Sequence, residues 1–268
     1  MRMNKFERRI ARYNDRSTAA FEAENFSRAL RYNDRALALL AALGATGEWD
    51  VASAEVDIYL NRSTVLHKLG RIAEAIAAAR SALAILTDLG ALDDPVMIGL
   101  SAIAVRTVSS PTDLAAPDVL TLALAAARAK LWLATLLALD SGTVGAAEVD
   151  ALGQSALAVY AFAADIDSSY KDDWETAFTN FALARLIVGH AHISSRDTRA
   201  AITIYEQLLS DCRRQFGAED IRTVTMRVQL AEARVLEYEI RRGDAQVAIA
   251  KFEEESFDNL RNAGFEFR

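Results

Sequence analysis

Residues 59–83, YLNRSTVLHKLGRIAEAIAAARSAL, predict two short helices joined by one tight turn. Tyr59, Ser63 and Leu66 recur at the spacing of one helical face, and Gly70 ends that helix. The next helix repeats the spacing with Ile72, Ala75, Ala79, Ala82 and Leu83. Small residues on both helices predict that the two backbones approach closely. A single helix pair cannot bury its apolar faces alone, so we expect further pairs to stack on this one.

The same pattern occurs earlier in the chain. Residues 13–18, YNDRST, return 46 residues later as residues 59–64, YLNRST, and the same offset relates Ala29 to Ala75. Because small and large residues correspond on both helices, the two segments predict equivalent helix pairs. In a third pair Gly189 takes the place of the small serine.

The repeat pattern resembles the tetratricopeptide repeat, and residues 205–237 resemble its longer variant, found in kinesin light chains and many bacterial proteins. This resemblance implies an all-α fold, a right-handed α-α superhelix of about eleven helices. It implies a single domain over residues 1–268, and a split near residue 140 is the alternative. The clear repeat pairs are expected at 3–44, 50–90, 173–216 and 220–262, with an irregular helical middle at 93–166.

Composition excludes several classes of protein. Three prolines and almost no alternating apolar pattern favour helices over a sheet, and the net charge of −7 disfavours binding to nucleic acids or anionic membranes. The lone Cys212 is expected to be an ordinary helix residue. Residues 119–139 are long and apolar enough to span a membrane, but they contain Arg128 and Lys130. We expect both cations to reach the surface of a buried helix, in a soluble and cytoplasmic protein.

In tetratricopeptide proteins the first helix of each pair lines a concave groove that holds a peptide or a partner helix. The resemblance therefore implies three ligand-binding stripes: Asn14, Thr18 and Phe21; Leu60, Thr64 and His67; and Leu186, His190 and Ile193. Asn61 takes the position of an asparagine that, in some members, helps to capture a carboxylate, although the accompanying cations are missing here. The alternative is that neighbouring helices pack against some of these positions.

Few features of the sequence suggest catalysis or metal binding. His190 and His192 lie two residues apart on a predicted helix, so they point in different directions and do not share a metal ion. The Asp172-Asp173 pair lacks the third acid of an aspartate-rich magnesium site. We therefore expect no catalytic residue, no metal site and no cofactor.

These observations favour a non-catalytic scaffold or adaptor that binds a protein or peptide in its groove. The alternatives are a regulatory sensor of a peptide or small molecule and, less favoured, an all-α enzyme. The expected partner is a protein or peptide rather than a nucleic acid or a membrane, and homodimer formation is left open.

Overall fold

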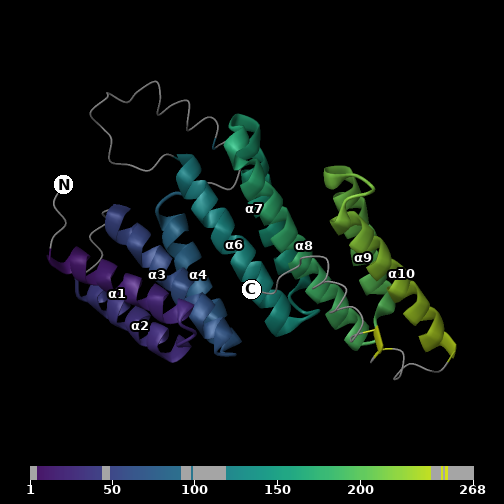
Figure 1. The fold of residues 1–268 in the computed structure, drawn as a ribbon, viewed down its shortest axis with the longest axis horizontal. Helices are drawn as coiled ribbons and strands as arrows, with labels where there is room; N and C mark the ends of the chain where they lie inside the picture. The colour runs from purple at the N-terminus through teal and green to yellow at the C-terminus, as the bar shows by residue number, and fades with distance from the viewer. Residues whose placement is uncertain are drawn as a thin grey trace. The chain divides into compact units, whose positions relative to one another are not determined.

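The structure, a computed structural model, describes residues 5–43, 49–91, 98, 119–242, 249 and 251–252. Over these residues the chain is helical and contains no strand. The α-helices are α1 (Lys5–Glu22), α2 (Phe26–Leu43), α3 (Trp49–Lys68), α4 (Ile72–Asp88), α6 (Val119–Ser141), α7 (Ala146–Ile166), α8 (Lys171–Ser194), α9 (Thr198–Phe216) and α10 (Ile221–Arg242). A short 3-10 helix, η1 (Ser168–Tyr170), precedes α8. The predicted all-α class is confirmed for this part of the chain (Figure 1).

The chain forms two compact units. Unit 1 contains Met1–Leu136 and Ala151–Ala177, and unit 2 contains Leu137–Asp150 and Phe178–Arg268. The division falls within α6, α7 and α8, so each of these helices contributes residues to both units.

In unit 1, α1 packs against α2 and α3 packs against α4, as the repeat predicts. The same hydrogen bond occurs in each of the two pairs. The hydroxyl of Ser17 donates to the carbonyl of Ala29 at 3.1 Å, and the hydroxyl of Ser63 donates to the carbonyl of Ala75 at 2.8 Å. All four residues are buried. Both serines therefore lie where the helices of a pair cross, at the positions related by the 46-residue offset.

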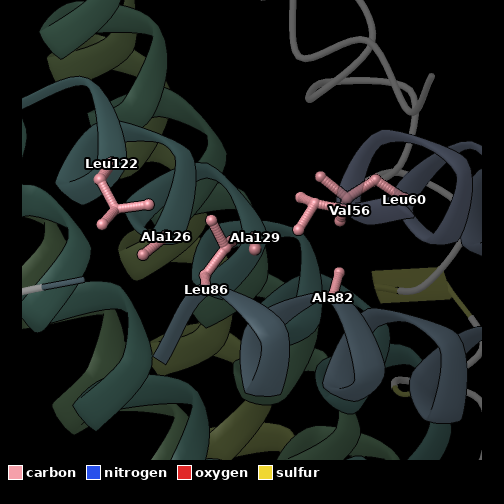
Figure 2. Close-up of a cluster of buried hydrophobic side chains, with 7 residues drawn as sticks. All are labelled: Val56, Leu60, Ala82, Leu86, Leu122, Ala126 and Ala129. Atoms are coloured by element: carbon pink, nitrogen blue, oxygen red, sulfur yellow. The ribbon is translucent and has the colours of Figure 1, made fainter. Parts of the chain in front are cut away.

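The middle of the chain continues this packing in unit 1. One face of α6 packs against both α3 and α4 (Figure 2), in a core formed by Val56, Leu60, Ala82, Leu86, Leu122, Ala126 and Ala129. The contact resembles that of α3, which packs against both α1 and α2. Two of the three α6 residues in this core are alanines, and their small side chains let α6 approach α3 and α4 closely.

The two cations of α6 differ in their surroundings. Arg128 is exposed and its Nη2 lies 3.3 Å from Oδ1 of Asp57, as expected for a surface cation. The prediction is wrong for Lys130, which is buried and donates from Nζ to the hydroxyl of Ser155 on α7 at 3.0 Å. Over 22 residues α6 is long and apolar enough to cross a membrane, but 67% of its most apolar window is buried within the molecule. A core helix of a soluble protein has the same properties.

In unit 2, a different pair of residues fills the equivalent crossing between α8 and α9. A Cβ atom added to Gly189 would lie 2.5 Å from Cε1 of Tyr205, whose side chain is fully buried. The missing side chain at Gly189 therefore makes room for the tyrosine ring. Tyr205 lies 16 residues after Gly189, the position that Ala79 occupies relative to Ser63, so a tyrosine replaces the alanine where a glycine replaces the serine.

A buried arginine joins three helices of unit 2. The side chain of Arg185 on α8 has Nε 3.2 Å from Oδ1 of Asp150 on α7 and Nη1 3.3 Å from Oδ2 of Asp211 on α9. Its guanidinium also lies 5.6 Å from the ring centre of Phe181. Two carboxylates compensate the charge, so Arg185 is a structural crosslink of this unit.

Nine α-helices lie within the described ranges. The first part of the irregular middle expected at 93–166 and the second helix of the pair expected at 220–262 fall almost entirely outside those ranges. The predicted total of eleven helices and the right-handed superhelix stay predictions.

Candidate functional site

The first two predicted ligand-binding stripes lie side by side in unit 1. Helices α1 and α3 are in contact, and Nδ2 of Asn61 donates to Oδ1 of Asn14 at 2.9 Å. Both asparagines are half-buried. Their mutual bond uses one N–H and one carbonyl oxygen, so each amide keeps further hydrogen-bonding capacity. An extended peptide presents the same two groups, N–H and C=O, along its backbone.

Threonines occupy the equivalent position on both helices. The hydroxyl of Thr18 donates to the carbonyl of Asn14 at 3.3 Å, and that of Thr64 donates to the carbonyl of Leu60 at 3.0 Å. Thr18 is exposed and Thr64 is half-buried. Each bond within the helix satisfies the hydroxyl hydrogen, whereas the oxygen keeps lone pairs that can accept from a ligand.

The apolar members of these two stripes take part in packing. Leu60 is buried in the core between α3, α4 and α6. The ring of Phe21 is half-buried and lies 5.4 Å from the ring of Phe26, at the turn that joins α1 to α2. Of these two side chains, only Phe21 keeps part of its surface accessible to a ligand.

His67 lies against a tryptophan that the sequence analysis did not include. Its ring packs edge-on against Trp132 of α6, with ring centres 5.4 Å apart, and the indole N–H of Trp132 donates to the hydroxyl of Ser63 at 2.8 Å. Burial, with a smaller contribution from the charge of Lys68, lowers the pKa of His67 below its ordinary value of 6.5. His67 is therefore neutral at pH 7. Trp132 is distant in sequence, and only the packing of α6 on α3 brings it here.

The third predicted stripe lies in the core of unit 2. Leu186, His190 and Ile193 are all buried. Nε2 of His190 lies 3.3 Å from Oε1 of Gln229 on α10, and its ring packs against Phe252 at 5.5 Å between ring centres. The expectation of an open stripe at these residues is corrected, because α10 and Phe252 cover His190 and leave only 8% of it exposed.

Other polar and reactive side chains of the two units have structural roles. Nε of Arg62, next to Asn61, lies 3.0 Å from Oδ1 of Asp34 on α2. Burial raises the pKa of Cys212 to about 11, so its thiol is protonated and unreactive at neutral pH. Nδ1 of His192 lies 3.5 Å from a carboxylate oxygen of Asp197. Within the described ranges, no three metal-ligating side chains gather at one point.

The neighbouring polar side chains Asn14, Thr18, Asn61 and Thr64, which we call the amide-threonine patch, are the strongest candidate site. They offer hydrogen-bond donors and acceptors and no charge, which suits recognition of a neutral polar backbone. No family model matches the chain, and no curated protein matches it. The tetratricopeptide resemblance therefore rests on the residues themselves.

Proposed function

We propose that this protein is a non-catalytic, tetratricopeptide-like scaffold that binds an extended peptide segment of a partner protein over the amide-threonine patch of unit 1. The observation that carries the proposal is the hydrogen bond between Asn14 and Asn61. It holds two equivalent stripes on α1 and α3 next to each other. Stacked repeats of this kind form a continuous concave surface, here a right-handed superhelix.

The chemistry of the patch supports a peptide over other ligands. Amide and hydroxyl groups form neutral hydrogen bonds to a peptide backbone, whereas capture of phosphate or carboxylate favours the cations that are missing here. The patch lies on packed helices with its amides already bonded to each other. A receptor ordered before binding loses less conformational entropy when the ligand arrives.

Selection of peptides tests the proposal. A library of random peptides displayed on phage is panned against the full chain, and the affinity of the selected peptides is measured by isothermal titration calorimetry. We expect N14A/N61A, which removes both amides together, to weaken binding by about tenfold or more, equivalent to the loss of at least ~1.4 kcal/mol. Thr18→Glu should have the same effect, because it places a charge within the patch.

Thr87→Glu is the matched control. Thr87 on α4 is also exposed, and its hydroxyl also donates to the carbonyl four residues earlier, at 2.9 Å from Leu83. It should leave affinity unchanged. The proposal fails if panning enriches no peptide, or if the selected peptides bind N14A/N61A and T18E as tightly as the wild type while circular dichroism shows both variants folded.

A further inference from the structure

Helix α10 carries an apolar stripe on its solvent side. Ile221, Val228, Val235 and Tyr238 have exposed fractions of 58%, 40%, 57% and 61%. Between them on the same face lie the half-buried Val224 and the exposed Ala231. We call these six residues the α10 seam. Large apolar side chains rarely gather on a solvent-exposed face, so the seam needs an explanation.

The spacing of the seam is that of a coiled coil. Successive members are separated alternately by three and four residues, which places Ile221, Val228 and Val235 at the a positions of a heptad repeat. Val224, Ala231 and Tyr238 take the d positions. The seam therefore covers three heptads over the 22 residues of α10.

The core of unit 2 uses the opposite face of the helix. The residues that α10 buries are Thr223, Thr225, Met226, Gln229, Leu230, Ala233 and Leu236. At 100° per residue, the centre of this set lies about 180° from the centre of the seam. Figure 1 shows α9 alongside α10, in agreement with their contacts. The seam is thus a second apolar face that packing against α9 does not use.

The two edges of the seam carry opposite charges. Arg227, Arg234 and Arg241 follow one another at heptad spacing along one edge, at the g positions. Glu232 and Glu239 lie along the other edge, at the e positions. In parallel coiled coils a g residue of one helix faces the e residue five positions later on its partner, and opposite charges there set partner and orientation.

We propose that the α10 seam pairs with the same seam of a second copy of this chain, as a parallel two-stranded coiled coil. In that arrangement Arg234 faces Glu239 of the second copy, and Arg227 faces Glu232. An antiparallel pair would instead place arginine opposite arginine and glutamate opposite glutamate. The β-branched residues at the three a positions also favour two strands.

The existing contacts of the arginines permit this pairing. Nη2 of Arg234 lies 2.7 Å from Oε1 of Glu206, and Nη2 of Arg241 lies 2.6 Å from Oε1 of Glu237. Both arginines are more than half exposed, and ion pairs on a protein surface contribute little stability, so they can exchange for bonds across the dimer. Phe252, from the C-terminal segment, is buried beside His190.

Sedimentation equilibrium of the full chain is the first test. We expect the wild type to dimerise at concentrations up to about 100 μM, and Val235→Asp to raise the dissociation constant at least about tenfold. Val144→Asp is the matched control, because Val144 is 90% exposed in unit 2 and lies outside the seam. It should leave the dissociation constant unchanged. If the wild type stays monomeric, the seam binds another protein or the C-terminal segment instead, and the proposal is overturned.

Charge exchange tests the parallel orientation. Arg234→Glu alone and Glu239→Arg alone each place like charges opposite each other across the dimer, so each should weaken self-association. An equimolar mixture of the two variants should form heterodimers with affinity close to that of the wild type, because each g position then faces an opposite charge again. Failure of the mixture to associate more tightly than either variant alone overturns the parallel pairing.

A cysteine variant provides an independent readout. Ile221 lies at the start of the seam, so Ile221→Cys should form a disulfide with its own copy only when the helices are parallel. Tyr238→Cys should do the same near the other end. The lone native cysteine, Cys212, is buried and does not compete. A disulfide that forms only in a mixture of the two variants would show antiparallel pairing and overturn the proposal.

Discussion

Ser17 and Ser63 hold equivalent places in two helix pairs but have different partners. Both donate to the carbonyl of an alanine twelve residues later. Ser63 also accepts the indole N–H of Trp132, because α6 packs against α3. One residue type at one repeat position therefore has two stabilising roles in the second pair and one in the first.

Replacement of these serines by alanine should separate the two roles. Ser63→Ala leaves the partly buried N–H of Trp132 without its acceptor, so we expect a loss of about 1–3 kcal/mol in the free energy of unfolding. Ser17→Ala removes one hydrogen bond and leaves no side-chain donor unpaired, so a smaller loss of about 0.5–1.5 kcal/mol is expected. Urea unfolding monitored by circular dichroism measures both, and equal losses would contradict the role of Trp132.

The structural role of a single residue was predictable where its partners lie within the same helix pair. The small residues at positions 17, 63 and 189 follow from the repeat, and the structure places all three at helix crossings. The surroundings of His67 and His190 were not predictable in this way. Their partners, Trp132, Gln229 and Phe252, are between 39 and 65 residues away in the sequence, and no local pattern reports such contacts.

At the scale of the helices, the crossing of α8 and α9 depends on the absence of a side chain at Gly189. Helix propensity alone predicts that Gly189→Ala stabilises the protein by about 0.5–1 kcal/mol. The position of Tyr205 predicts the opposite sign, because the new methyl group would overlap a fully buried ring. We expect a destabilisation of about 1–3 kcal/mol, typical of overpacking in a core.

The control for this prediction is the same substitution beside a smaller neighbour. In a Tyr205→Leu background the ring atoms near Gly189 are gone, so Gly189→Ala should be neutral or stabilising. Urea unfolding of the four proteins in the cycle gives the coupling between the two positions. A destabilisation of equal size in both backgrounds would rule out the ring as its cause.

Turn and cap residues that are visible in the sequence mark the ends of some helices. Gly70 and Gly217 adopt positive φ angles after α3 and α9, and Asp197 caps α9 by accepting from the backbone N–H of Ala200 at 3.2 Å. The second apolar face of α10 was missed. Its spacing of three and four residues is visible in the sequence, but only the structure shows which of its two apolar faces packs against α9.

At the scale of the whole molecule, the two units divide a chain whose tryptophans all belong to unit 1. Trp49, Trp132 and Trp174 lie in the residue ranges of that unit. Tryptophan fluorescence therefore follows the unfolding of unit 1, whereas circular dichroism at 222 nm follows the helices of both units. The two signals therefore report on unit 1 alone and on both units together.

We expect the two signals to give the same urea midpoint. Helices α6, α7 and α8 each contribute residues to both units, so neither unit can lose its structure without unravelling helices that the other uses. Coincident transitions are the standard sign of cooperative unfolding. A fluorescence midpoint clearly separated from the midpoint at 222 nm would show that the units unfold independently.

The amide pair of Asn14 and Asn61 has a consequence for selectivity. A side-chain amide can rotate by half a turn and exchange its donor and acceptor ends, and when both members rotate their mutual hydrogen bond is restored with reversed polarity. The same two amides can then form a hydrogen bond with either an N–H or a C=O group of a peptide, whichever way the peptide chain runs. Under the proposed function, such reversible groups would let the site bind peptides of many sequences with moderate affinity.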